Sequence, residues 1–154
     1  MKVVFFSESG IIGKVDRTFP NARNDIAWSI MMDADWCPYG KTPTEKYDLG
    51  VVTIPKTKPN LDVDWFKQHC DKIAIMQEGP HWYFQDYSVE QQFQFVENLR
   101  KADWVWCHNK SDVSYYKGLG CKDVRVMRTL MLPEGLNCQL TTSQKKGILL
   151  GGNF

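Results

Sequence analysis

Acid–base side chains are concentrated in one short segment of the chain, between Glu78 and Asp86. Glu78, His81 and Asp86 supply two carboxylates and one imidazole, which are groups that act as general acids and bases. In such a site they would position a hydroxyl group or remove its proton. They could equally hydrogen-bond sugar hydroxyls or cap nearby backbone. Because no Ser/His/Asp or Cys/His order here is diagnostic of a nucleophile, we treat them as candidate catalytic residues of the acid–base type.

The same segment carries an unusual number of aromatic rings. Phe, Tyr and Trp make up 13% of the whole chain, and Trp and Tyr combine an apolar ring with a polar handle. Sugars present apolar C–H faces to such rings and hydroxyls to nearby polar groups. We therefore predict that Gly79, Trp82 and Tyr83 contact a carbohydrate or a nucleoside. The alternative is an aromatic lid that covers the edge of the core.

Two further polar clusters follow apolar runs. Ser9 and Gly10 lie in SESGIIG, which matches neither G-x-G-x-x-G nor a Walker loop, so the glycines either contact a ligand or only make the turn. His108 and Asn109 follow the run DWVWC. Asn109 could cap the next helix, and the start of that helix could bind an anion. We include all four residues among the candidate substrate-binding residues.

The elements that must position these residues alternate along the chain. Capping signals and apolar spacing predict four helices, two of which begin at Asn24-Asp25 and at Ser111 or Asp112. A capping box of Ser88 and Gln91 begins another, with Val89, Phe93, Val96 and Leu99 on its apolar stripe. The fourth helix spans 62–70, and the segment 37–46 is predicted to be loop. The predicted strands are 2–6, 47–54, 72–76, 103–107, 123–129 and 147–150.

This alternation predicts an α/β fold, a Rossmann-like three-layer αβα sandwich with a mostly parallel sheet. In open parallel sheets, ligands bind outside the carboxyl ends of the strands. The three polar clusters follow strands 2–6, 72–76 and 103–107. We therefore expect them to converge on one edge of the sheet.

Bulk composition limits the function classes. The chain has 154 residues, a net charge of +1 and 24% charged residues, so the basic footprint of a nucleic-acid-binding protein is missing. No apolar segment approaches the ~20 residues of a membrane span, and no signal peptide is evident, so we expect a cytoplasmic protein. The five cysteines are widely spaced without a CxxC pair, which favours reduced, structural residues. His69, on a predicted helix, is expected to be solvated.

The order EGPHWYFQDY, an amphipathic helix, ADWVWCHNKSDVSYYKGLG and then DVRVMRTLMLPEG resembles the N-terminal half of GT-B glycosyltransferases. It is most similar to sugar transferases related to glycosyltransferase families 1 and 4. Ala102-Asp103, His108-Asn109 and the crossover 131–136 carry this resemblance. The end of the chain, KKGILLGGNF, resembles the strand and glycine turn that open the second Rossmann domain of such enzymes.

The resemblance implies a domain organisation and an activity. Residues 1–130 would form a Rossmann-like acceptor-side domain, 131–146 a connector, and 147–154 the start of a second domain that the chain lacks. The chain would then be the acceptor side of a glycosyltransferase that moves a sugar from a nucleotide-sugar donor to a carbohydrate or other hydroxyl acceptor. Because the donor is bound mainly by the second domain in that family, the chain would be inactive alone. We expect no metal and no other cofactor.

Two alternatives belong to other functional classes. The chain could be a stand-alone, flavodoxin-like module that binds a nucleotide or a sugar. It could also be a structural domain whose aromatic cluster forms a homodimer interface, because Trp is favoured at interface hot spots. The first alternative predicts that strand 147–150 joins the main sheet, and the second predicts that Trp82 and Tyr83 are buried against another copy.

Overall fold

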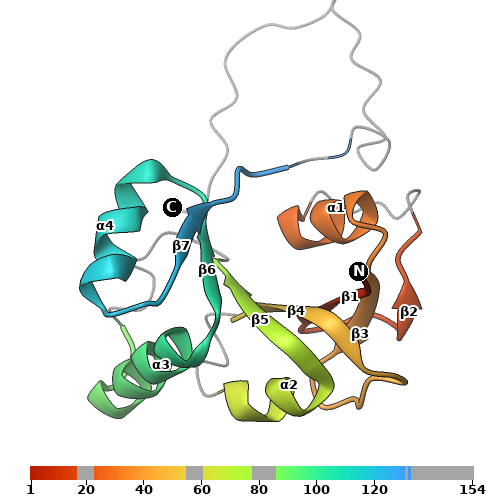
Figure 1. Ribbon diagram of the computed structural model, residues 1–154, viewed down its shortest axis with the longest axis horizontal. Coiled ribbons are helices and arrows are strands. Elements are labelled where there is room, and N and C mark those ends of the chain that lie inside the picture. Colours follow the sequence, from red (N-terminus) through yellow and green to blue (C-terminus); the bar gives the residue numbers. More distant parts are fainter. Residues whose placement is uncertain (17–22, 55–60, 78–85, 131, 133–154) are drawn as a thin grey trace, which may run out of the picture.

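The computed structural model describes residues 1–16, 23–54, 61–77, 86–130 and 132. Within these residues the chain forms a mostly parallel sheet flanked by helices on both faces (Figure 1). The α/β fold class predicted from the sequence, a Rossmann-like αβα sandwich, is thereby confirmed.

The sheet runs in the order β2-β3-β1-β4-β5-β6-β7, and only β2 is antiparallel to its neighbour. Strand β3 lies on one side of β1, with β2 at that edge of the sheet. Strand β4 lies on the other side of β1, and β5, β6 and β7 follow outward in sequence order. The strand order therefore reverses between β1 and β4. The strands are β1 (Val3–Ser7), β2 (Gly13–Lys14), β3 (Asp35–Pro38), β4 (Tyr47–Thr53), β5 (Cys70–Met76), β6 (Trp104–Cys107) and β7 (Val124–Val126).

The helices divide unequally between the two faces of the sheet (Figure 1). Helix α1 (Asn24–Met31) packs through Ile26 on the face formed by Phe5, Val51 and Met76. The other three helices pack on the opposite face: α2 (Val63–His69), α3 (Val89–Lys101) and α4 (Lys110–Gly118). Each face thus buries its own apolar cluster, as a parallel sheet requires.

The helix starts follow local chemistry where a polar cap is available. The predicted capping box at α3 is confirmed: the Ser88 hydroxyl accepts from the Gln91 N–H, and the Gln91 side chain accepts from the Ser88 N–H. At α2 the Asp62 carboxylate accepts from the Asp64 N–H. Helix α4 begins after Asn109, one turn earlier than predicted, so the expected caps Ser111 and Asp112 lie inside the helix.

Three other local predictions are wrong. The segment predicted as loop begins inside β3, because Cys37 and Pro38 are the last two residues of that strand. Trp36 is buried on the α1 face of the sheet and Cys37 on the opposite face. A four-residue strand ending in proline has a weak local signal, and its pairing with β1 stabilises it. Helix α1 ends at Met31 rather than near Ala34, because Asp33 adopts a positive φ of 48°. His69 is only half-exposed, with its ring 4.6 Å from that of Trp65.

The predicted apolar stripe of α3 is only partly correct. Leu99 is buried, but Val89 and Phe93 are 70% and 68% exposed. The buried side of the helix instead carries Phe95 and Asn98. The helix sequence offers two overlapping apolar stripes, one through Phe93 and one through Phe95. The packing of the helix on the sheet buries the second.

The cysteines behave as core residues. Cys37, Cys70, Cys107 and Cys121 are buried and free, which confirms the prediction for these four, while Cys138 lies outside the described residues. Burial raises the pKa of Cys70 to about 12 and that of Cys121 to about 11.

The predicted connector 131–146 and strand 147–150 also lie outside the described residues, apart from position 132. Among the described helices, none has the length and apolar character needed to cross a bilayer.

Close approach of β1, β4 and β5 depends on Gly50. A Cβ at this position would lie 2.7 Å from Cys70 Sγ and 3.1 Å from both Ile73 Cδ1 and Phe6 Cε2. We expect Gly50→Ala to lower the free energy of unfolding by about 1–3 kcal/mol, because the extra methyl overpacks the core. Urea denaturation measures the change. Gly118→Ala is the control, since a Cβ there meets nothing within 4 Å; equal effects of the two substitutions would contradict this account.

Candidate functional site

A cavity of about 300 Å³ opens at the carboxyl edge of the sheet. Its wall combines the end of β4, the end of β5 and the start of α1, the helix that follows β1. It therefore lies beside the point where the strand order reverses, which is where open α/β sheets bind ligands. The lining residues are Arg23, Asn24, Asp25, Thr53, Met76 and Gln77.

A charged cluster forms one side of this cavity. Asp25 is only 4% exposed, and its carboxylate accepts two hydrogen bonds from the Arg23 guanidinium, at 2.6 Å and 3.1 Å. The Ser7 hydroxyl at the end of β1 donates to Asp25 at 2.9 Å and accepts from Arg23 at 2.8 Å. The pair is charge-balanced, and a bidentate geometry of this kind is the favourable one for a buried carboxylate.

Thr53 contributes a hydroxyl that has no partner. The residue is 4% exposed, and its Oγ1 makes no hydrogen bond within the part of the chain that the structure describes. It lines the cavity at the last position of β4. A buried hydroxyl without a partner is unfavourable. A ligand hydroxyl or a carbonyl in the cavity would satisfy it.

Gln77 is held in one orientation on the opposite side. Its Nε2 donates to the Asp112 carboxylate of α4 at 3.0 Å, and its Oε1 accepts from the His108 N–H at 3.0 Å. Since an amide nitrogen donates and an amide oxygen accepts, these two contacts fix the amide assignment. The wall of the cavity at the end of β5 is thus positioned by α4 and by the residue after β6.

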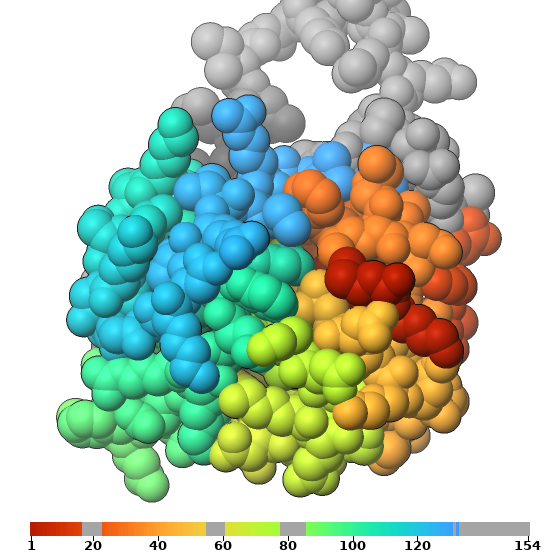
Figure 2. All heavy atoms as spheres, in the orientation of Figure 1, coloured from red at the N-terminus to blue at the C-terminus, as the bar shows by residue number. Residues whose placement is uncertain are grey.

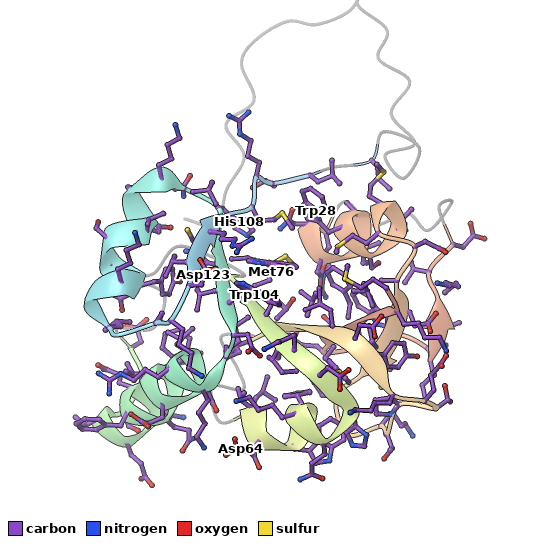
Figure 3. All side chains as sticks on the ribbon, viewed as in Figure 1. Trp28, Asp64, Met76, Trp104, His108 and Asp123 are labelled. Carbon is purple, nitrogen blue, oxygen red and sulfur yellow. The ribbon has the colours of Figure 1, made fainter. Side chains whose placement is uncertain are left out.

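His108 also joins α1 to the segment after β7. Its Nδ1 lies 3.0 Å from the Met127 carbonyl and its Nε2 lies 3.4 Å from Asn24 Nδ2. A neutral ring with its proton on Nδ1 satisfies both contacts. The Asn24 Oδ1 in turn accepts from the Leu130 N–H at 2.8 Å. Figure 3 shows His108 beside Met76 and Trp28, between β7 and α1.

The segment 127–130 therefore crosses over to α1. Besides the Asn24 contact, the Trp28 indole donates to the Arg128 carbonyl at 3.0 Å. Figure 2 shows the atoms that follow β7 (blue) in contact with those of α1 (orange). This crossing fixes Asn24, and with it the rim of the cavity.

Ser9 and Gly10, two of the predicted substrate-binding residues, line a different cavity. This one, of about 260 Å³, lies between the β1–β2 turn and α1, and Arg23 is the only described residue that lines both cavities. The Ser9 carbonyl accepts from the Trp36 indole at 2.6 Å. Gly10 has a φ of 118°, and a Cβ there would lie 2.5 Å from Trp36 Nε1. The turn and the close approach of Trp36 are sufficient reasons for this glycine.

The remaining predicted residues fall into two groups. His108 is placed beside the strand-end cavity, whereas Asn109 is exposed at the start of α4 and its side chain does not cap the helix. Asp86 is exposed in the turn before α3 and is not among the residues that line the cavity. The others lie outside the described residues: Glu78, Gly79, His81, Trp82 and Tyr83.

Sequence reasoning missed most of the cavity wall. Arg23, Asp25, Thr53 and Gln77 are not among the predicted site residues, although a signal was present. Ser7, Thr53 and Gln77 are polar residues at or just after the ends of apolar strands. In an open parallel sheet, ligands bind at this edge. Only the tertiary structure shows that their side chains meet the start of α1.

The polar groups that the described residues bring to the cavity can form hydrogen bonds with a ligand. No group of three or more His, Cys, Asp or Glu that could hold a metal ion occurs among them. Comparison with known proteins found no matching family model, no matching curated protein and no matching solved structure. Function must therefore be inferred from the fold and the cavity.

The unpartnered Thr53 hydroxyl makes a prediction about stability. Thr53→Val removes the hydroxyl and keeps the branched shape, so we expect the free energy of unfolding to rise by about 1 kcal/mol in the absence of ligand. Thermal or urea denaturation measures the change. Thr44→Val, at an exposed position in the β3–β4 loop, is the control and should not be stabilised. A loss of stability in Thr53→Val would show that the hydroxyl has a partner.

Proposed function

We propose that the chain binds a hydroxyl-bearing ligand, a sugar or a sugar-like molecule, in the strand-end cavity, as the acceptor side of a glycosyltransferase. The observation that carries the proposal is that Thr53 lines this cavity and its buried hydroxyl has no partner among the described residues. Such a group favours a ligand that can both donate and accept hydrogen bonds, and hydroxyl groups do both.

The position and size of the cavity support the proposal. It lies at the reversal of strand order, the usual ligand site of this architecture. A volume of about 300 Å³ is at the lower end of small-molecule sites and suits a monosaccharide unit. Asn24 and Gln77 add side-chain amides to the wall, and amides hydrogen-bond sugar hydroxyls well.

The transferase part of the proposal follows the resemblance to GT-B enzymes. In this proposal the donor is a nucleotide-sugar bound mainly by a second domain, and the acceptor hydroxyl sits in the cavity described above. Glu78, His81 and Asp86 remain the proposed acid–base groups, with Trp82 and Tyr83 as proposed stacking surfaces. The segment that carries most of them follows Gln77 directly, and Gln77 lines the cavity.

A second candidate is a stand-alone sugar- or nucleotide-binding module. The observation that favours it is that the described residues lining the cavity all come from one domain, between Arg23 and Gln77. Such a site needs no partner domain to bind its ligand. The two candidates differ in whether the bound hydroxyl is an acceptor for transfer.

Two-dimensional NMR with a panel of methyl glycosides and nucleosides tests the binding step. We expect the backbone amide signals of Asn24, Asp25, Thr53 and Gln77 to shift with at least one compound. Thr53→Val should weaken the affinity about five- to tenfold, because one hydrogen bond is lost, while Thr44→Val should leave it unchanged.

The outcomes separate the candidates. No shift of these four signals with any compound at millimolar concentration would contradict a hydroxyl-binding cavity. Mass spectrometry of the bound compound after incubation with nucleotide-sugars then tests for transfer. Binding without transfer by the native full-length protein would favour the stand-alone module.

A further inference from the structure

We propose that Asp25 is a specificity-determining residue: it occupies the anion position of the cavity as an internal carboxylate, so that the cavity selects neutral hydroxyl ligands over phosphorylated ones. The inference deepens the proposed function and rests on it for the identity of the neutral ligand. It goes beyond that function because it assigns the charge of the ligand and the residue that sets it.

Without Asp25, the site would have the ingredients of an anion-binding site. The start of α1 faces the cavity through Asn24, and the first N–H groups of a helix attract anions. The Arg23 guanidinium, the group best suited to phosphate, lies beside them. Thr53 adds a buried hydroxyl donor.

Asp25 satisfies the positive groups in this arrangement. One carboxylate oxygen accepts from the Ile26 N–H at 2.9 Å and from Arg23 Nε at 3.1 Å. The other accepts from an Arg23 terminal nitrogen at 2.6 Å and from the Ser7 hydroxyl at 2.9 Å. A helix end, a cation and a hydroxyl are therefore already directed at an anion that belongs to the protein.

A phosphate in the cavity would meet this buried carboxylate. Like charges repel strongly where water is excluded, and the guanidinium that could offset the repulsion is bound to Asp25 in a bidentate pair. Among the described residues, the other polar groups on the wall are neutral: the Thr53 hydroxyl and the amides of Asn24 and Gln77. They suit an uncharged hydroxyl ligand, and they disfavour the phosphates of a nucleotide at this position.

The test compares neutral and anionic probes on three variants of the full chain. The probes are a panel of methyl glycosides, the matching sugar phosphates and inorganic phosphate, followed by NMR titration. For the native protein we expect a methyl glycoside to bind at least tenfold more tightly than its phosphate. Asp25→Asn keeps the shape of the side chain but removes its charge, and should raise the affinity for inorganic phosphate at least tenfold, with a steep dependence on salt.

Two further variants control for charge and for folding. In the double variant R23Q/D25N the cation is also removed, so the gain in phosphate binding should disappear. Asp33→Asn removes an exposed carboxylate after the other end of α1 and should not change phosphate binding. If D25N does not fold, the comparison of a methyl glycoside with its phosphate on the native protein still decides between the two ligand classes, and equal binding of both would overturn the inference.

The failure of the inference and the failure of the proposed function give different results. Equal or tighter binding of the sugar phosphate by the native protein, or no gain of phosphate binding in folded D25N, would overturn the inference while leaving a hydroxyl-binding cavity in place. If no glycoside binds the native protein but D25N gains phosphate affinity, the role of Asp25 stands and the proposed sugar ligand is wrong.

Discussion

The pairing of β1 with both β3 and β4 is the constraint on which the other features of the structure depend. All five residues of β1 are buried, and the strand is hydrogen-bonded in parallel to a neighbour on each side. Because consecutive parallel strands then leave β1 in opposite directions, a crevice opens at the carboxyl ends of the central strands. The start of α1 lies at that crevice, where Asn24 and Asp25 line the cavity. The cavity is thus a consequence of strand order, and its chemistry depends on which side chains end those strands.

The polar groups at those strand ends differ in whether they have hydrogen-bond partners within the protein. On the β1 side, Ser7, Arg23 and Asp25 are joined by hydrogen bonds, and Arg23 and Asp25 form an ion pair. On the β4 side, Thr53 leaves its hydroxyl without a partner among the described residues. The first arrangement stabilises the fold by pairing a buried charge. The second is unfavourable unless the hydroxyl gains a partner, and the proposed binding rests on it.

The rim of the cavity is held by residues distant in sequence. Asn24 on α1 accepts from the N–H of Leu130, 106 positions further along the chain, and His108 lies between them with contacts to Asn24 and to Met127. Gln77 is fixed in the same way by α4 and by the His108 N–H. The two wall amides are thus positioned before any ligand arrives. Preorganisation of this kind reduces the entropy lost on binding.

The sequence alone determined the fold class, most strand and helix positions and the edge of the sheet at which polar groups gather. Those features follow from local apolar spacing, from caps such as Ser88 and Gln91, and from the general geometry of parallel sheets. The tertiary structure decided the rest. The strand β3 exists because β1 pairs with it, the buried side of α3 depends on its position over the sheet, and the partners of Asp25 and Thr53 come from separate elements. The physical reason is that hydrogen bonds and burial in this cavity join residues far apart in the chain, and no local pattern encodes which of them meet.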